Sequence, residues 1–327
     1  MRLVNVCTGG NVVAILTFLF LAAPVSYASR GDRDSMYINC VHKCHKSSCS
    51  SPGADAQLPL ILQLTRWSCH ENCQYECMHD VTTTYLAVGH AVEQYYGKWP
   101  FVRVLGLQEP ASVIFSILNG YMHWIGYRKL RRHIPRWYPL RRIYLLNALL
   151  GVNAWIWSTV FHARDFPVTE KLDYFSAVGS ILFAACLAVI RVFQFQHRRN
   201  VESWMLTGFA MLFYVAHVSY LVFWPFDYGY NMIAGVTVGV ASNTVWIWWF
   251  LHNWRSRPYA WKVLLSVLLI SAAMSLELLD FPPWKWAIDA HALWHAATIP
   301  LVYLYYSFLL DDVRWEIRAG KGKSPIH

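Results

Sequence analysis

The sequence predicts an all-α polytopic membrane protein, with seven transmembrane helices preceded by a small disulfide-rich lumenal domain. Hydrophobic residues make up 56% of the 327 positions and charged residues only 14%, whereas soluble domains carry about 25% charged residues. From residue 111 onward, apolar runs of roughly the 20 residues that cross a bilayer alternate with short polar connections. Six of the eight cysteines lie in the polar region before these runs.

The net charge of +9 does not indicate a nucleic-acid partner. The basic residues lie mostly in the short connections between apolar runs, which is typical of cytoplasmic loops in membrane proteins. We therefore expect no nucleic-acid binding.

Residues 1–28 are predicted to be a secretory signal peptide. Arg2 supplies the positive end, residues 12–23 form a short apolar core, and Ser26-Tyr27-Ala28 fits the small-x-small cleavage pattern. An uncleaved anchor is the alternative, but the short core and the polar sequence directly after it favour cleavage. The mature chain would then begin in the lumen.

Residues 29–110 form the predicted cysteine-rich lumenal region. An even number of cysteines in a short lumenal segment indicates disulfides, with zinc binding as the alternative. The spacings Cys40-x3-Cys44 and Cys69-x3-Cys73-x3-Cys77 place sulfurs on one face of a helix each time. We expect two helices joined into a stapled hairpin, with Pro52, Gly53 and Pro59 in the connection. The sequence does not choose among the possible cysteine pairings.

Residues 111–310 form the predicted membrane core and residues 311–327 a short cytoplasmic tail. The seven predicted membrane segments are Ala111–Tyr127, Ile143–Phe161, Tyr174–Phe193, Trp204–Phe223, Met232–Leu251, Trp261–Leu279 and Trp286–Leu310. Their connections alternate in charge. The connection at residues 128–142 has seven Lys or Arg and no acid, while those at 164–173, 226–228 and 280–285 are acidic or mixed. The positive-inside rule places the basic connections and the C-terminus in the cytoplasm, and the N-terminus in the lumen.

Two histidines in the last membrane segment are the first candidates for function. His291 and His295 are four residues apart and so share one face of a helix, and ionisable side chains inside a membrane are costly and usually functional. Ser158 and His162 share a face in the second segment, and Asp173 begins the third. The predicted topology brings all five residues to one depth, just inside the lumenal face.

Three imidazoles with an open fourth position are a recognised zinc arrangement for hydrolysis, because zinc lowers the pKa of a bound water to about 7. We expect His162, His291 and His295 to bind zinc. Asp173 would hold the water or accept its proton, and Ser158 would stabilise a developing oxyanion.

A helix–helix hydrogen bond is the simpler interpretation of a membrane histidine, and it is the one we apply to His123 and His217. Six further acids lie near the depth of the predicted site, and the sequence does not sort them: Glu109, Asp165, Asp227, Glu277, Asp280 and Asp289. We expect Asp289 to cap its helix or to support a ligand.

The five site residues on a seven-span core resemble the superfamily of alkaline ceramidases, progestin/adiponectin-type receptors and Per-like proteins. Within it, most of the chain is similar to the Per-like family. The resembling stretches are Cys40-Val-His-Lys-Cys44, Trp67-Ser-Cys69, Cys73-x-Tyr-Glu-Cys77, Gly97-Lys-Trp-Pro-Phe101, Gln108-Glu-Pro-Ala-Ser112, Asn153-Ala-Trp-x-Trp-Ser-Thr-Val-Phe-His162, Phe226-Asp-Tyr-Gly-Tyr-Asn231, Leu278-Leu-Asp-Phe-Pro-Pro283 and Asp289-Ala-His-Ala-Leu-Trp-His295.

The resemblance implies remodelling of the lipid of GPI anchors. The reaction would be a zinc-dependent, phospholipase A2-type hydrolysis that removes the unsaturated sn-2 acyl chain from GPI-anchored proteins. The family works in the Golgi in animals, with the endoplasmic reticulum as the alternative. Three other functions stay open: a ceramidase-like amidase, a seven-span lipid-binding receptor, and a non-catalytic escort of GPI-anchored proteins. Acyl-chain preference and oligomeric state do not follow from the sequence.

Overall fold

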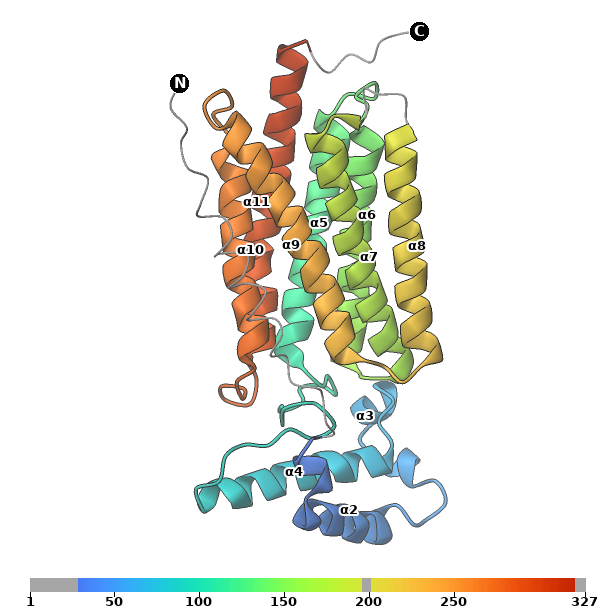
Figure 1. The fold of residues 1–327 in the computed structure, drawn as a ribbon. Helices are drawn as coiled ribbons and strands as arrows, with labels where there is room; N and C mark the ends of the chain where they lie inside the picture. Colours follow the sequence, from blue (N-terminus) through green and yellow to red (C-terminus); the bar gives the residue numbers. More distant parts are fainter. Residues whose placement is uncertain (1–28, 196–200, 321–327) are drawn as a thin grey trace.

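The computed structural model describes residues 29–195 and 201–320. The predicted signal peptide and the end of the predicted tail lie outside the described residues. Within them the regular secondary structure is helical, apart from three isolated two-residue bridges. A bundle of long helices stands on a small domain, called here the cysteine domain (residues 29–109), which lies at one end of the bundle (Figure 1).

Two antiparallel helices form the frame of the cysteine domain: α2, Ser35–Ser48, and α4, Cys69–Ala87. Asp34 caps α2 by accepting hydrogen bonds from two backbone amides, and Ser68 forms a capping box with Glu71 at the start of α4. The short helices are η1, Gly31–Arg33, and, in the connection between α2 and α4, η2, Ala54–Gln57, and α3, Leu60–Leu64.

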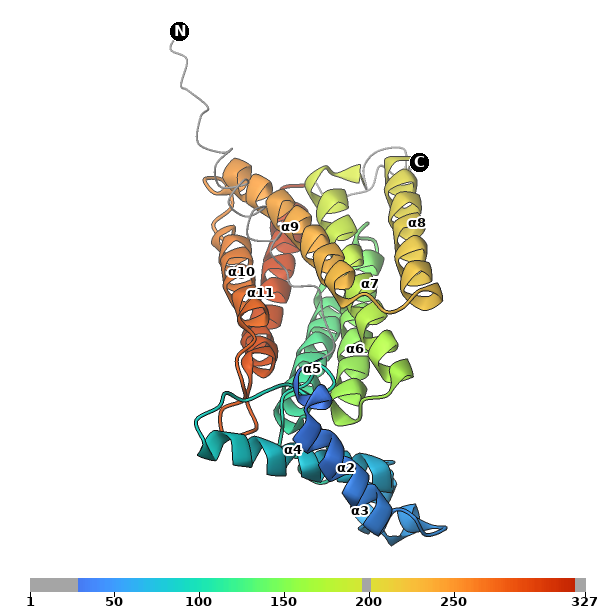
Figure 2. The same cartoon turned by 60° about the horizontal axis from the view of Figure 1, so that its bottom comes forward.

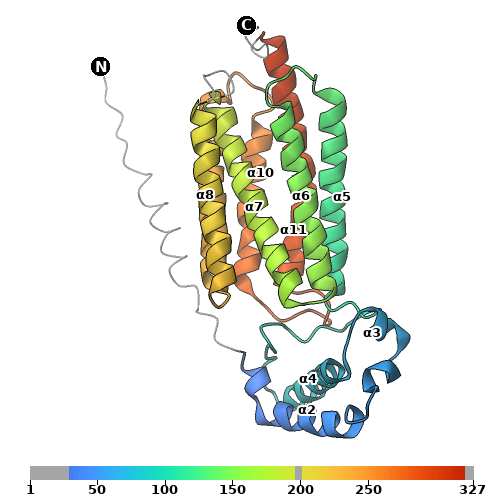
Figure 3. The same cartoon turned by 90° about the vertical axis from the view of Figure 1, so that its right-hand side faces the viewer.

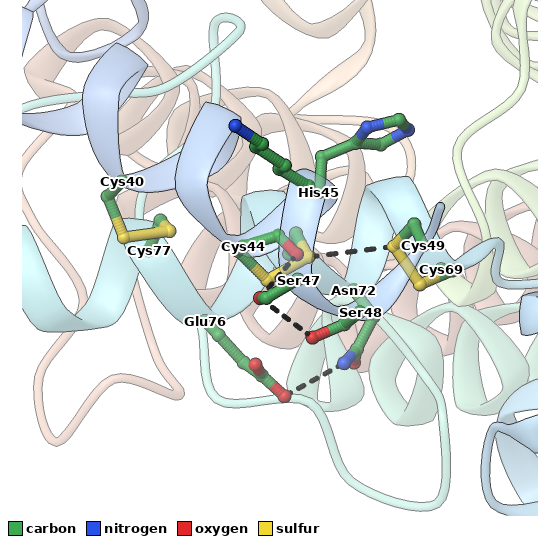
Figure 4. The surroundings of a disulfide bond; sticks show 12 residues. Cys40, Cys44, His45, Ser47, Ser48, Cys49, Cys69, Asn72, Glu76 and Cys77 are labelled. Carbon is green, nitrogen blue, oxygen red and sulfur yellow. Dashed lines mark hydrogen bonds between the residues drawn. A yellow bond between two sulfur atoms is a disulfide. The ribbon is translucent and has the colours of Figure 1, made fainter. Parts of the chain in front are cut away.

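Three disulfides join α2 to α4 as nested rungs (Figure 4). The pairs are Cys40–Cys77, Cys44–Cys73 and Cys49–Cys69. Their nesting fixes the antiparallel arrangement, which confirms the predicted disulfides and the stapled hairpin and supplies the pairing. It also removes the alternative of zinc on these cysteines, because disulfide sulfurs are not thiolates.

The bundle contains seven helices in the described part of the chain. They are α5, Pro110–His133; α6, Arg141–Ala163; α7, Pro167–Val192; α8, Val201–Phe223; α9, Tyr228–Asn253; α10, Trp261–Leu279; and α11, Ala290–Arg318. The six from α6 to α11 are long and apolar enough to cross a membrane. A polytopic all-α membrane protein is thereby confirmed, but a count of seven spans is not.

Helix α5 is the one that falls short in hydropathy, although it runs along the bundle with the others and packs against α6 and α11 (Figures 1 and 3). Ser112, Ser116, Asn119 and His123 recur at spacings of four, three and four residues, so they form one polar face. This face is turned toward the interior, where Asn119 donates a hydrogen bond to the His295 carbonyl at 2.7 Å.

A buried ion cluster ties the helices together at the end of the bundle away from the cysteine domain. Asp312 on α11 accepts hydrogen bonds from Arg191 on α7 at 2.6 Å and from Arg257 at 2.7 Å. Glu316, one turn later, pairs with Arg191 at 2.8 Å and accepts from the Tyr138 hydroxyl at 2.8 Å. All four charged side chains are buried.

The cysteine domain lies against two connections of the bundle, those between α6 and α7 and between α10 and α11 (Figure 2). Asp280 accepts hydrogen bonds from Gln94 at 2.9 Å and from the Trp99 indole at 2.8 Å. On the other side, the Glu109 backbone amide donates to the His162 carbonyl at 3.0 Å. These contacts place the chain entering α5 directly beside the ends of α6 and α11.

Candidate metal centre

Three imidazoles from two helices converge at the end of the bundle nearest the cysteine domain. His162 is on the last turn of α6, and His291 and His295 are on the first two turns of α11. The Nε2 atoms of His162 and His291 are 3.3 Å apart. One nitrogen from each of the three rings lies within 4.8 Å of the others, so the three rings could share one ion.

Each of the three rings contacts another side chain through its Nδ1 atom. The Nδ1 of His162 is 2.7 Å from a Glu109 carboxylate oxygen, and that of His291 is 2.6 Å from Glu277 on α10. The Nδ1 of His295 is 3.0 Å from the Ser116 hydroxyl on α5. In the tautomer that donates from Nδ1, the lone pair of Nε2 is available to a metal, which is how metal-binding histidines are usually oriented.

Glu109 belongs to a chain of charges that begins in the cysteine domain. Its carboxylate accepts from the Lys98 ammonium at 2.5 Å, and the same ammonium pairs with Asp165 at 3.2 Å. Burial acts to raise the pKa of Glu109, but Lys98 and His162 outweigh it and hold that pKa well below its usual range. The carboxylate behind His162 is thus kept charged.

The two other predicted site residues lie at the same end of the bundle as the imidazoles. Ser158 is buried one turn before His162, and its hydroxyl is 3.0 Å from that of Ser116, which in turn contacts His295. Asp173 is on the second turn of α7, and His291 and Lys98 are among the charged groups that act on its carboxylate. The structure therefore gathers all five predicted residues at one end of the bundle.

The six acids that the sequence left unsorted take different roles. Glu109 and Glu277 contact His162 and His291. Asp289 and Asp227 are N-caps, as expected for Asp289, whose carboxylate accepts from the Ala292 amide at 2.8 Å. Asp280 and Asp165 bind side chains of the cysteine domain.

Sequence reasoning placed Glu277 and Glu109 near the site without singling them out as partners of the imidazoles, and it missed Ser116. Glu277 could have been found, because an acid inside a predicted membrane helix is itself a sign of function. Ser116 could also have been found, because it belongs to the polar face of α5. The sequence holds no comparable signal for Glu109, which precedes Pro110 in a polar connection.

The donor set suits zinc, for which three imidazoles plus an open position are a catalytic pattern. His162 and His295 are buried, while the His291 side chain is 36% exposed. An ion in this site would therefore be reached from the side of His291. His123 and His217, which we expected to form helix–helix hydrogen bonds, lie outside this group of three imidazoles. His123 contacts the Tyr306 hydroxyl at 2.8 Å, a helix–helix hydrogen bond as expected. His217 is buried on α8.

Comparison with known proteins identifies the family. The model of the Per1-like family matches residues 59–313. The chain belongs to the Per1-like family. This Per1-like chain is 43% identical over 305 residues to a Xenopus laevis protein named GPI-specific phospholipase A2-like PGAP3, covering 92% of this chain and 95% of the relative.

The human protein of that name is 40% identical over 316 residues, covering 96% of this chain and 98% of the relative. A Schizosaccharomyces pombe protein named Protein PER1 homolog is 41% identical over 318 residues, covering 96% of each chain. No solved structure matches this Per1-like chain.

Proposed function

We propose that the protein remodels the lipid of GPI anchors by zinc-dependent, phospholipase A2-type hydrolysis of the sn-2 acyl ester. The observation that carries the proposal is the convergence of His162, His291 and His295, each held at Nδ1 by a separate side chain. The names of the relatives, GPI-specific phospholipase A2-like, support the substrate class.

Zinc held by the three imidazoles would supply a water nucleophile at neutral pH and polarise the ester carbonyl. Asp173 accepts the proton of the attacking water, and Ser158 donates a hydrogen bond to the oxygen that gains charge at the carbonyl. Glu109 and Glu277 keep two imidazoles oriented through their Nδ1–H groups. The C–O bond then breaks, giving a fatty acid and a lyso-GPI whose sn-2 hydroxyl carries the returned proton.

The position of the site suits a lipid substrate. The imidazoles lie at the end of membrane-spanning helices, and the exposed side of His291 gives an acyl ester access from the adjacent leaflet. The glycan of the anchor would then project toward the cysteine domain. We propose that this end faces the lumen, with the C-terminus in the cytoplasm, because disulfides form in oxidising compartments and the connections at the opposite end are basic. The Golgi is proposed on the family resemblance alone, with the endoplasmic reticulum as the alternative.

The decisive assay measures lyso-GPI formed by purified protein in lipid nanodiscs. Wild type should release fatty acid from GPI, and Asp173→Asn should lose at least about a hundredfold in rate because it removes the proton acceptor. His252→Gln, which alters an exposed histidine at the far end of α9, should act as wild type. Equal activity of the Asp173 variant, or hydrolysis of ceramide with no action on GPI, would overturn the proposal.

A further inference from the structure

An exposed apolar patch stands on the side of the cysteine domain that faces the bundle. Leu60 and Leu64 occupy one face of α3, one turn apart, and each is 70% exposed, while Leu62 on the opposite face is buried. Leu105, at the tip of the turn Val104–Leu107, is 72% exposed. Large exposed apolar patches on folded domains usually mark a surface that binds something.

Helix α3 and this turn form one surface. The Trp67 indole donates a hydrogen bond to the Gly106 carbonyl at 2.9 Å. A Cβ on Gly106 would meet the Thr65 hydroxyl oxygen at 2.3 Å, so the turn abuts the end of α3. Leu105 itself has a φ of 52°, in the left-handed region that a leucine rarely adopts. Its side chain is nonetheless mostly exposed in this conformation.

The patch lies at the level where the chain leaves the membrane. Arg66, directly after α3, stands over the Phe166 ring at 5.8 Å, and Arg164 stands over the same ring at 4.6 Å and over Trp67 at 4.1 Å. Residues 164–166 connect α6 to α7, and both of these helices are long and apolar enough to span. A segment in contact with this connection is therefore at headgroup depth.

The figures agree with this placement. Helix α3 is at the edge of the cysteine domain nearest the bundle, beside the ends of the bundle helices, while α2 is on the far side of the domain (Figures 1 and 3). Val168, on the first turn of α7 and two residues after Phe166, is also exposed, at 68%.

We infer that α3 and the Val104–Leu107 turn are a membrane foot of the cysteine domain. Leu60, Leu64 and Leu105 enter the boundary between headgroups and acyl chains of the adjacent leaflet, and Arg66 remains at the level of the lipid phosphates. The foot is a second attachment of this domain to the bilayer, in addition to the bundle itself. This attachment would form whether or not the protein is a hydrolase or binds zinc.

The test places an environment-sensitive NBD label on the foot. In a Cys7→Ala, Cys186→Ala background, which leaves the three disulfides as the remaining cysteines, Leu64→Cys is labelled and the full chain is reconstituted in phosphatidylcholine nanodiscs. The matched control is Ile38→Cys, another exposed apolar residue of the domain, on the face of α2 turned away from Cys40. Intact disulfides, counted by thiol titration, show that each variant is folded.

Insertion predicts blue-shifted emission at position 64 and quenching by doxyl-labelled phosphatidylcholine at least about threefold stronger than at position 38. A label at Leu105→Cys should behave as the one at 64. Equal, weak quenching at 38 and 64 would overturn the inference. So would blue-shifted emission at 64 without lipid quenching, because the patch would then be covered by protein, such as a second copy of the chain.

Discussion

At the scale of single residues, the role of the carboxylate that contacts His291 can be tested separately from that of the three imidazoles. Glu277 contacts Nδ1 of His291 at 2.6 Å from a neighbouring helix, and its side chain is 18% exposed. Such partners fix the tautomer of a metal-binding histidine and raise its basicity, and removing one typically weakens metal binding about 10–100-fold.

Glu277→Gln should therefore lower zinc affinity by roughly 10–100-fold while all three imidazoles remain. The measurement is a competition titration of purified protein against a zinc chelator, which does not depend on catalysis. Glu76→Gln is the control, because Glu76 is on α4, away from the imidazoles, and accepts a hydrogen bond from Asn72, one turn before it. An unchanged zinc affinity in the Glu277 variant would show that this carboxylate does not support a metal ligand.

Part of the candidate site could be predicted from the sequence. The spacing His291-x3-His295 puts two rings on one face, and alternating loop charge brings Ser158, His162 and Asp173 to the same depth. The predicted segment Trp261–Leu279 includes Glu277 and excludes Asp280, but it does not show that Glu277 contacts an imidazole while Asp280 binds the Trp99 indole. That distinction depends on the side-chain packing between helices, which hydropathy does not encode.

At the scale of elements, hydropathy predicted where helices exist and not how far they run. The apolar segment predicted to end at Leu310 belongs to α11, which continues to Arg318, because the helix extends past the apolar run into the buried cluster around Asp312 and Glu316. The cysteine spacings predicted that the sulfurs lie on one face of each helix, but the pairing of the disulfides depends on the antiparallel register of α2 and α4. Only the fold supplies that register.

The docking of α4 against the bundle predicts a response to pH. His79 on α4 is 3.1 Å from the Phe101 carbonyl and stacks edge-on with Trp286 of the α10–α11 connection. Burial lowers the pKa of His79 below the ordinary histidine value of about 6.5, and the hydrogen bond to Phe101 offsets this only in part. The unfolded chain then binds the proton more tightly than the folded chain does. The stability contributed by neutral His79 is therefore complete above about pH 6.5 and is lost as the pH falls below it.

The midpoint of thermal unfolding should thus fall between about pH 7 and pH 5 in wild type, and fall less in His79→Gln. His42→Gln, which alters an exposed histidine on α2, serves as the control and should retain the wild-type slope. If the His79 variant loses stability on acidification as steeply as wild type, the pH response has another origin.

At the scale of the whole molecule, the bundle is held at its two ends by different means. Next to the cysteine domain it is closed by the site and by Lys98, Glu109 and Asp165. At the far end, two guanidinium groups from α7 and from the α9–α10 connection share the carboxylate of Asp312. Removing one partner of a buried ion pair typically costs about 3–5 kcal/mol, because an uncompensated charge stays buried.

Two neighbouring aspartates give a matched test of that far end. Asp312→Asn should destabilise the protein by about 3–5 kcal/mol, because Arg191 and Arg257 would both lose their shared anion. Asp311→Asn should cost no more than about 1 kcal/mol, since its pair with Lys262 is 28% exposed on the aspartate side. Denaturant unfolding in detergent compares the two variants, and equal losses would contradict the assignment of the cluster.

The most direct test of the central claim is the zinc content of the purified full-length protein. Mass spectrometry of the metal should find about one zinc per chain in wild type and little in His162→Gln or His295→Gln, because three imidazoles form the site. His123→Gln, which alters a part-buried histidine that bonds Tyr306 instead, should keep its zinc. Wild-type protein without zinc, or His162 and His295 variants that bind as much zinc as wild type, would contradict the proposed metal centre.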